Sequence, residues 1–526
     1  MIKYSRLKLG LLLAISVLLV FPHLLLAAPD PVFDEVKALV EAFYVDPVDA
    51  KQLNVNSSQE LLAKLGDEYS LYMTAAEFEE FMGSIEGQYA GIGVYLNGQM
   101  LPEGIEVSGI IGGSPAEKAG LKAGDVIVRI DQKIVGGLDL DTVCGMLLGP
   151  AGTRVQIEVK TGQLNRNFTL FRQIINIPVV NSSRMDFNTA YIDIDSFSEE
   201  ADQDLADTMA SCRKDGADKW IIDLRGNPGG YIDSAIEMAG IFIGPGVVTV
   251  LEERDTVTSY RTDHPQVQAS EPVIILIDEN SASASEILAA ALRDHRKAIL
   301  LGSTTYGKGT VQEIYPLSNG DWLKLTTARF YSPLGIPING IGVDPDLPLD
   351  SKNIIKAAEL LLSDPPDGGA GSYELQANGH GFVVDLALAR SPQYWEVWGD
   401  VTGQLQYLPA YKGAGGERYD LLTTSQVQDR TALYYPNASS IGSIDNYSPG
   451  RDIVLYISQE SGAGWNADNI EMLNSATGEQ LEVAVEVSAD KFVRIKPFAN
   501  LLPGEYWVIF NDGQQEDFLA RIGVQQ

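Results

Sequence analysis

The strongest constraint on the fold is a regular alternation of short apolar runs with helical stretches between about residues 180 and 350. Apolar runs at 190–194 and 273–278 are followed by stretches with helical spacing at 202–214 and 285–295. Strands that alternate with helices predict an α/β sheet with parallel strands, because each helix carries the chain back to the start of the next strand. This segment therefore predicts the largest hydrophobic core of the chain.

The remaining sequence divides into further segments, because 526 residues are too many for a single hydrophobic core. Apolar residues at helical spacing, together with a capping box from Thr74 to Glu77, predict a helical region over 29–85. Short strands and turns follow over 86–165. The alternating strands and helices then predict a core domain over 166–363.

The C-terminal part differs in composition from the rest. Residues 364–372 are rich in Pro, Gly and Asp, which predicts a linker. Residues 373–526 predict a β-rich extension, and the strand pattern at about 450–526 resembles bacterial immunoglobulin-like modules. The expected fold class is therefore a multidomain α/β and β protein with a β-sandwich-like C-terminal extension.

Residues 1–28 have the pattern of an export signal. Three basic residues, Lys3, Arg6 and Lys8, precede an apolar run over 9–28. The small-residue cleavage site is only half present, and a run of about 20 residues almost spans a bilayer. A cleaved signal peptide and a retained membrane anchor therefore both remain open, with cleavage favoured. Either way, we expect an exported protein that is secreted, periplasmic or held at the cell envelope.

Composition and spacing argue against several classes of function. The chain has 38 Lys and Arg residues against 71 Asp and Glu residues, a net charge of −33, which would repel the phosphates of nucleic acid. Its two cysteines and four histidines show no metal-ligand spacing, so we expect no metal site. Residues 302–308 nearly match a phosphate-binding loop, but Gly309 stands where Ser or Thr would hold magnesium.

A serine and a lysine lie in the two loops that one βαβ unit brings together. The predicted unit runs from a strand at 272–278 through a helix to a strand at 298–302. A right-handed crossover places the loops after both strands at the same carboxyl edge, so we expect Ser283 and Lys308 to lie close together. A Ser–Lys pair is a known variant of the catalytic triad, provided that the lysine is neutral.

Burial can supply the neutral amine, because it lowers the pKa of a lysine by up to about 3–5 units. The immediate neighbours of Lys308 in the sequence include no carboxylate, which is consistent with an apolar pocket. Taken alone, however, Ser283 also forms a capping box with Glu286, so a purely structural role for this serine stays open.

A glycine-rich turn follows the predicted strand at 220–224 and precedes a helix. Free backbone amides gather at such a turn, and they can stabilise a negatively charged oxygen. We expect the N–H groups of Gly229 and Gly230, together with that of Ala284 at the start of the serine-bearing helix, to form an oxyanion hole.

Several motifs, in this order, resemble those of the carboxyl-terminal processing peptidases, also called tail-specific proteases, of peptidase family S41. They are DLRGNPGG at 223–230, SASASEI at 281–287 and GKGTVQ at 307–312. The resemblance extends over about 32–349.

This resemblance implies roles for individual residues. It implies that Ser283 is the nucleophile among three nearby serines, that Lys308 is the base, and that Gln312 is a supporting polar member of the catalytic group. Asp294 also matches a family position that is important for activity. The resemblance implies no cofactor.

A second resemblance, to the PDZ family, covers about 86–165. The run GSPAEKAGLKAGD at 113–125 predicts a short helix that starts after Ser114 and ends at Gly120. The resemblance implies a groove that binds protein C-termini by β-augmentation. The implied peptide-binding residues are Gly91, Ile92, Gly93 and Val94 in a carboxylate-binding loop, and Val143, Met146 and Leu147 facing the groove.

Together these features predict an exported serine endopeptidase that recognises the apolar C-terminal tails of proteins or peptides and cleaves them with a Ser–Lys pair. The alternative is a non-catalytic extracytoplasmic PDZ scaffold on a protease-like fold. A third hypothesis is an enzyme whose PDZ domain blocks the site until a tail binds. A homo-oligomer is compatible with the sequence.

Overall fold

The computed structural model describes residues 30–49, 51–263, 271–366, 371–405, 409–413, 419–457, 465, 467–488, 492–511 and 517–525. The predicted signal peptide or anchor at 1–28 lies outside these residues. Within the described ranges, no helix combines the length and the apolar character needed to cross a membrane.

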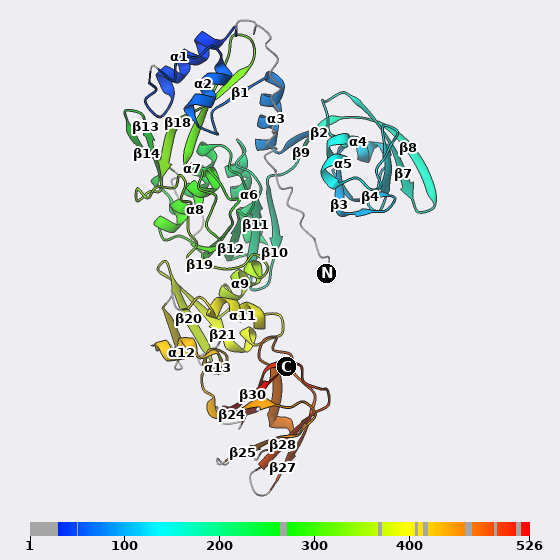
Figure 1. Ribbon diagram of the computed structural model, residues 1–526, viewed down its shortest axis with the longest axis vertical. Helices are drawn as coiled ribbons and strands as arrows, with labels where there is room; N and C mark the ends of the chain where they lie inside the picture. The colour runs from blue at the N-terminus through cyan, green and yellow to red at the C-terminus, as the bar shows by residue number, and fades with distance from the viewer. Residues whose placement is uncertain are drawn as a thin grey trace.

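A six-stranded sheet forms the centre of the molecule (Figure 1). The strand order is β10-β11-β12-β15-β16-β19, and all strands except the edge strand β10 run parallel. These strands are β10 (Val180–Arg184), β11 (Thr189–Ile194), β12 (Lys219–Asp223), β15 (Val273–Ile277), β16 (Ile299–Gly302) and β19 (Leu347–Pro348). The parallel sheet that the alternating pattern predicts is therefore confirmed.

Both faces of this sheet are covered, as is usual for parallel strands. Ile222 and Ile275 lie in the hydrophobic core on one side, and Ile221 and Ile274 lie in the core on the other side, because neighbouring side chains along a strand point in opposite directions. Helices α6 (Ala201–Lys214), α7 (Ile232–Ile243) and α8 (Ala284–Asp294) cover the first face, and α9 (Ile354–Leu361) covers the second.

A second sheet holds the N-terminal helices against the central α/β core. It comprises β1 (Leu71–Met73), β13 (Gly246–Glu253), β14 (Val257–Thr262), β17 (Thr310–Pro316) and β18 (Trp322–Tyr331), and it packs against α1 (Phe33–Phe43) and α2 (Ser58–Leu65). Leu323 and Leu325 of β18 share one buried cluster with Val36 and Leu61 of these helices. The third helix, α3 (Ala75–Ile85), begins with the capping box predicted at Thr74.

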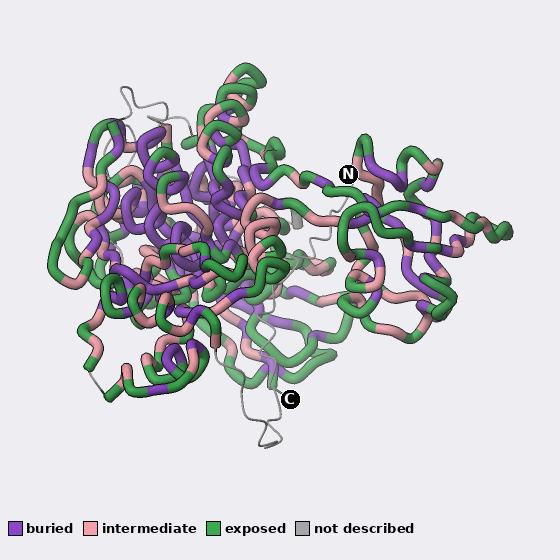
Figure 2. The backbone as a smooth tube through the Cα atoms, turned by 90° about the horizontal axis from the view of Figure 1, so that it is seen from above, coloured by how far each residue is buried: buried purple, intermediate pink, exposed green. Residues whose placement is uncertain are grey.

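The chain between β2 (Gln88–Gly91) and β9 (Gln173–Asn176) folds into a unit with its own core. Figures 1 and 2 show this unit standing to one side, joined to the rest through β2 and β9, which pair with each other. Its elements are β3 (Val94–Leu101), β4 (Gly104–Ile110), α4 (Pro115–Ala119), β5 (Val126–Ile130), β6 (Lys133–Ile134), α5 (Leu140–Leu147), β7 (Arg154–Thr161) and β8 (Leu164–Phe171). The Ser114 side chain caps α4, and Gly120 ends it with a φ of 80°, as predicted.

The C-terminal extension contains more helix than the sequence suggested. Its first part comprises β20 (Ser372–Ala377), β21 (His380–Asp385), α10 (Leu386–Ala389), α11 (Trp395–Thr402), β22 (Ala410–Gly413), β23 (Tyr419–Leu421), α12 (Thr424–Gln428) and α13 (Arg430–Tyr434). Each of these helices has eight residues or fewer, about two turns, so it gives too few apolar repeats for a periodic signal.

The last part of the extension contains the two sheets of a sandwich, as the β-rich pattern predicted. One sheet has the order β24-β30-β29-β26 and the other β25-β28-β27. The strands are β24 (Ser439–Tyr447), β25 (Ile453–Tyr456), β26 (Ile470–Asn474), β27 (Val483–Val487), β28 (Phe492–Pro497), β29 (Gly504–Asn511) and β30 (Asp517–Val524).

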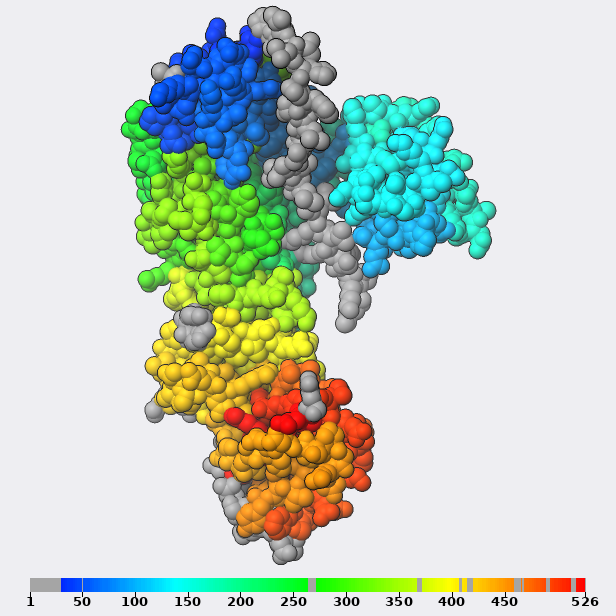
Figure 3. Space-filling view, in the orientation of Figure 1, coloured from blue at the N-terminus to red at the C-terminus, as the bar shows by residue number. Residues whose placement is uncertain are grey.

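The extension is packed onto the parallel sheet. Tyr373, Trp398 and Trp507 of the extension lie in the same buried cluster as Ile221 and Ile274 of the central sheet. Figure 3 shows the extension, in yellow to red, directly below the green α/β core. Of the predicted linker, residues 367–370 lie outside the described residues.

Candidate active site

One buried carboxylate joins the loop that carries Ser283 to the loop that carries Lys308. Ser283 precedes α8 after strand β15, and Lys308 follows strand β16, which pairs with β15 in parallel. The carboxylate of Glu286 accepts hydrogen bonds from the backbone N–H groups of Ser283 (2.8 Å), Gly307 (2.7 Å) and Lys308 (2.9 Å), and from the Thr305 hydroxyl (2.5 Å). The two loops of the predicted βαβ unit therefore meet at one edge of the sheet.

Glu286 itself was recognised in the sequence only as half of a capping box. It is fully buried, and burial raises its pKa, although the hydrogen bonds from Thr305, Gly307, Ser283 and Lys308 oppose that rise. A carboxylate with several donors of this kind is a strong acceptor, because hydrogen bonds to charged groups are stronger than those between neutral groups. Glu286 therefore fixes the relative position of the two loops.

Ser283 has an unusual backbone conformation, with φ 57° and ψ −115°. A positive φ in a residue other than glycine is strained, and such residues cluster at functional sites. Gly229 packs directly against this turn, since a Cβ atom on Gly229 would lie 2.8 Å from the Ser283 Cβ and 2.9 Å from the Ala284 nitrogen. We call residues 282–284 the serine turn. Only glycine can occupy position 229 without displacing it.

The glycine-rich turn supplies fewer free amides than the sequence suggested. The N–H of Gly229 donates to the side-chain oxygen of Asn227 at 2.8 Å, so this expected donor is engaged elsewhere. The Asn227 backbone oxygen in turn accepts the N–H of Ala282 at 3.0 Å and the Ser285 hydroxyl at 3.0 Å. Asn227 therefore links the glycine turn to the segment around Ser283 through its backbone oxygen, while its side-chain oxygen holds the N–H of Gly229 within the glycine turn.

The other two expected oxyanion-hole donors are the N–H groups of Gly230, in the glycine-rich turn, and Ala284, at the start of α8. Within the described part of the chain, no hydrogen bond takes up the N–H of Gly230 or of Ala284. Gly230 is packed tightly, since a Cβ atom there would lie 2.3 Å from the Phe197 carbonyl oxygen. These two amides remain as candidates for stabilising an oxyanion.

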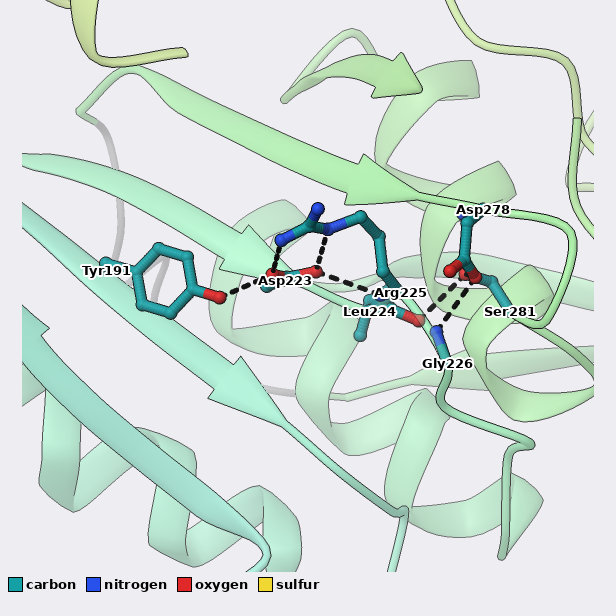
Figure 4. A network of polar contacts seen from close by, with 7 residues as sticks. All are labelled: Tyr191, Asp223, Leu224, Arg225, Gly226, Asp278 and Ser281. Atoms are coloured by element: carbon teal, nitrogen blue, oxygen red, sulfur yellow. Dashed lines mark hydrogen bonds and ion pairs between the residues drawn. The ribbon is translucent and has the colours of Figure 1, made fainter. Parts of the chain in front are cut away.

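A salt-bridged network fixes the base of the glycine turn (Figure 4). Buried Asp223 accepts hydrogen bonds from the backbone N–H, Nε and Nη2 of Arg225, at 3.0, 2.9 and 2.6 Å, and from the Tyr191 hydroxyl. The N–H of Gly226 donates to Asp278 at 2.8 Å. The sequence motif contained Asp223 and Arg225 but gave no role for them; the structure shows that they hold the end of β12 in place.

Lys308 occupies a partly buried position between aromatic and charged groups. Its Nζ atom lies 5.3 Å from the centre of the Tyr69 ring. Burial, and then the positive charge of Lys324, lower the pKa of Lys308 to about 8, while Glu286 and Asp67 oppose this shift. About a tenth of such a lysine is neutral at pH 7. The sequence next to Lys308 did not indicate the carboxylates of Glu286 and Asp67, because both residues lie in other segments of the chain.

Two further residues of the site were missed in the sequence. Lys324 on β18 is partly buried, its Nζ atom lies 4.9 Å from the centre of the Phe81 ring, and burial lowers its pKa. Burial also raises the pKa of Tyr69, which hydrogen bonds with Glu68 and Tyr306. No local pattern could connect Tyr69 or Lys324 with Lys308, because the three come from segments that only the fold brings together.

Gln312 and Asp294 have partners other than Ser283 and Lys308. Gln312 donates to the hydroxyls of Thr310 (2.9 Å) and Thr326 (3.3 Å) within the β17–β18 pair. Asp294 lies at the opposite end of α8 from Ser283, where it accepts hydrogen bonds from the Ser332 hydroxyl at 2.5 Å and the Leu334 N–H at 3.1 Å. Asp294 therefore braces the segment after β18.

The expected peptide groove is only partly as predicted. Gly91, Ile92 and Gly93 are buried and Val94 is partly buried, consistent with a loop that presents its backbone. Val143 and Leu147 are 0% and 4% exposed and belong to the core of this unit, so the expectation that they face an open groove is wrong. The reason is that residues four apart lie on one face of a helix, here the inner face of α5.

Met146 and Leu148 are better placed to contact a ligand. Met146 packs against the core of the unit but remains partly exposed. Leu148, which the sequence analysis did not single out, is 40% exposed. Its Cδ2 atom would lie 3.3 Å from a Cβ atom on Gly91. An exposed apolar side chain therefore adjoins the predicted carboxylate-binding loop.

Comparison with known proteins gave consistent matches. Residues 188–349 match the family described as peptidase family S41, and residues 106–161 match the PDZ domain family. The chain is 34% identical over 311 residues to a protein named "Probable CtpA-like serine protease" from Staphylococcus haemolyticus. The aligned region covers 59% of this chain and 62% of that relative. The chain thus spans less than two thirds of that relative.

A second relative is covered more completely. The chain is 34% identical over 323 residues to a protein named "Carboxy-terminal-processing protease" from Bartonella bacilliformis, with 60% of this chain and 74% of that protein covered. Among solved structures, the photosystem II D1 C-terminal processing protease aligns at 25% identity with a TM-score of 0.42, over 64% of this chain and 98% of that one.

Proposed function

This chain belongs to peptidase family S41, is a serine-type peptidase and carries a PDZ domain, and we propose that Ser283 is its nucleophile and Lys308 its general base. The observation that carries this proposal is the buried Glu286 carboxylate, which accepts hydrogen bonds from the backbone of both residues. The positive φ of Ser283 supports it further, because strained backbone persists where the surrounding structure and the function require it.

The proposed reaction is acyl transfer to a serine. Neutral Lys308 removes the proton of the Ser283 hydroxyl as its oxygen attacks the scissile carbonyl, and the protonated amine then gives the proton to the leaving amine. Water releases the acyl group from Ser283 in a second step. A pKa of about 8 for Lys308 suits this role, because a general base works best when its pKa lies near the working pH.

We propose that the amides of Gly230 and Ala284 stabilise the oxyanion of the tetrahedral intermediate. The contribution of Gly229 is different from the one expected, because its N–H is bonded to Asn227 while its missing Cβ lets the glycine turn approach Ser283. Donors aimed at a developing negative charge are worth about 2.7–4 kcal/mol each in the transition state. Gln312 and Asp294 support the surrounding strands and loops in this proposal.

The PDZ unit is proposed to capture the apolar C-terminal tail of a protein or peptide substrate by β-augmentation. Gly91, Ile92, Gly93 and Val94 would present backbone N–H groups to the terminal carboxylate, and Leu148 offers an exposed apolar side chain beside Gly91. We also propose that the protein is exported, on the basis of the pattern in residues 1–28. We propose moving the limit predicted at residue 165 to after Phe171, because β8 crosses it and Leu170 of β8 lies in the core of the PDZ unit; the limits at 86 and 363 remain part of this proposal.

A turnover experiment tests the catalytic assignment. The wild type, Ser283→Ala and Lys308→Ala are compared on one unstructured reporter that ends in an apolar residue. Both variants should lose activity by a factor of at least about 1,000, because neither a nucleophile nor a base can be replaced by solvent at that position. Lys352→Ala is the matched control, since this lysine side chain is 76% exposed, and its activity should equal that of the wild type. Equal turnover by all four proteins would contradict the assignment.

A further inference from the structure

The turn between β20 and β21 of the C-terminal extension contacts the connection between α8 and β16. The side-chain amide of Asn378 donates to the backbone oxygens of Arg293 (2.7 Å) and Ala298 (3.0 Å). The Nε2 atom of His380 hydrogen bonds to the backbone oxygen of Arg296 at 3.0 Å. Three backbone carbonyl groups between the end of α8 and the start of β16 therefore accept hydrogen bonds from the extension, and that of Arg293 also accepts the N–H of Arg296 at 2.9 Å.

The connection that the extension contacts is short and irregular. Arg296 has a φ of 53°, a left-handed conformation that glycine usually adopts at the end of a helix. The following N–H, of Lys297, returns to the Leu292 oxygen at 2.8 Å and closes the helix end. A strained residue of this kind persists where its surroundings hold it in place, and here part of those surroundings is the β20–β21 turn.

The turn itself is a regular two-residue β-hairpin connection. Ala377 pairs with His380 across two residues, Asn378 and Gly379, whose φ angles are 46° and 82°. Asn-Gly with two positive φ angles is the preferred two-residue connection of a β-hairpin. The turn explains why an asparagine suits position 378. It does not require the two hydrogen bonds that the side-chain amide makes to the other segment.

The contacted connection belongs to the unit that carries both proposed catalytic residues. Helix α8 begins immediately after Ser283, and β16 leads into the loop with Lys308. Residues 284–292 of α8 are buried, so the helix is packed on all sides and behaves as a rigid rod. A change in position at its far end would therefore displace Ser283 relative to Lys308.

We propose that Asn378 and His380 are positioning residues, through which the C-terminal extension fixes the helix that presents Ser283. The extension then contributes to catalysis by positioning Ser283, although it lies outside residues 188–349, which match peptidase family S41. This inference rests on the proposed role of Ser283 as nucleophile.

Three variants of the full-length protein test the inference. Asn378→Gly keeps the positive φ and removes the amide, Asn378→Asp keeps the size and places a carboxylate against two carbonyl oxygens, and His380→Ala removes the imidazole. Gln376→Ala is the matched control, because this exposed glutamine on β20 bonds to Glu374 and not to α8. Circular dichroism and the unfolding temperature establish that each protein is folded at the assay temperature.

Two kinetic readouts distinguish positioning from simple stabilisation. We expect the rate at which a fluorophosphonate labels Ser283, and kcat for a peptide substrate, to fall about tenfold in the Asn378 variants, with KM unchanged, because small misplacements of a nucleophile cost that much or more. In His380→Ala the labelling rate and kcat should fall by a smaller factor. In Gln376→Ala both should equal those of the wild type.

The outcomes separate the two claims. Folded Asn378 variants that label and turn over at the wild-type rate, with only a lower unfolding temperature, would overturn the positioning role. A wild-type protein that is not labelled at Ser283 would instead overturn the proposed function itself. If Asn378→Asp does not fold, Asn378→Gly and His380→Ala still decide the question.

Discussion

At the scale of single residues, the proposed chemistry depends on the protonation state of one amine. The pKa of Lys308 is lowered to about 8, first by burial and then by Lys324, against the opposing effect of Glu286 and Asp67. Below pH 8 the amine is mostly protonated and cannot accept the Ser283 proton. The acylation rate should therefore rise with pH through about 8 and then level off, provided that the enzyme stays folded.

Replacing Lys324 tests the origin of this pKa. Lys324→Met removes a positive charge from the surroundings of Lys308, so the pKa of Lys308 should rise, and the pH at half-maximal acylation should move up by about half to one unit. Lys324→Arg keeps the charge and should leave the profile near that of the wild type. The measurement is kcat/KM against pH for all three proteins. A profile that does not move in Lys324→Met would show that Lys324 does not contribute to the pKa of Lys308.

Residue motifs indicated the two proposed catalytic residues, Ser283 and Lys308, but not the groups that surround them. Ser283 could be chosen over Ser281 and Ser285 only through the family resemblance, because spacing alone treats the three alike. Tyr69 and Lys324 were missed because their proximity to Lys308 depends on long-range folding and leaves no local pattern. The Gly229 amide was assigned wrongly, since a sequence cannot show that the Asn227 side chain turns back to accept it.

At the scale of elements, the site depends on how closely the glycine turn approaches the start of α8. Gly229 has a φ of 104°, and an added Cβ would lie 2.8 Å from both the Ala282 oxygen and the Ser283 Cβ. The turn is joined to the start of the helix by the backbone oxygen of Asn227, which accepts the Ala282 N–H and the Ser285 hydroxyl, while the Asp223–Arg225 salt bridge fixes the end of β12. The space between them is therefore set by the absence of one side chain.

Gly229→Ala should disrupt this approach. The new methyl group must displace the serine turn, so we expect kcat to fall about 100-fold with a smaller loss of thermal stability. Gly112→Ala is the control, because a Cβ there meets no atom within 4 Å and the backbone needs no positive φ. Steady-state kinetics and thermal unfolding of both variants give the comparison. Wild-type activity in Gly229→Ala would mean that the two elements are not in close contact.

The sequence predicted the type of most elements near the site and fewer of those far from it. The strands β12, β15 and β16 were predictable because strands buried on both faces appear as short continuous apolar runs, and α8 because a longer stretch without Gly or Pro separates two of them. The short helices α10 to α13 were missed because they have too few turns. The inward direction of Val143 and Leu147 was also missed, since an apolar helical face suits either a groove or a core.

At the scale of the whole molecule, the extension and the PDZ unit are attached in opposite ways. The extension shares a hydrophobic core with the central sheet, in which Tyr373, Trp398 and Trp507 lie in the same cluster as Ile221 and Ile274. The PDZ unit has a separate core and is joined through β2 and β9, where Gly91 pairs with Gln173. Removing the two parts should therefore have different consequences.

Two deletions test this difference. Truncation after Ser363 uncovers one face of the central sheet, and since each buried large apolar side chain contributes about 1.5–3 kcal/mol, the loss should exceed a typical net stability of about 5–15 kcal/mol. We expect an insoluble or molten protein. Replacing residues 92–172 by an Asn-Gly turn should leave a folded core with a cooperative thermal transition. A truncated chain with the same unfolding temperature as the full-length protein would contradict the shared core.

The most direct test of the account is to map the site of covalent attachment of a fluorophosphonate by peptide mass spectrometry, in the wild type and in Lys308→Ala. The account predicts that the adduct forms on Ser283 in the wild type, faster at pH 9 than at pH 7, and forms far more slowly in Lys308→Ala. An adduct on another residue, or equal labelling of Ser283 in both proteins, would contradict it.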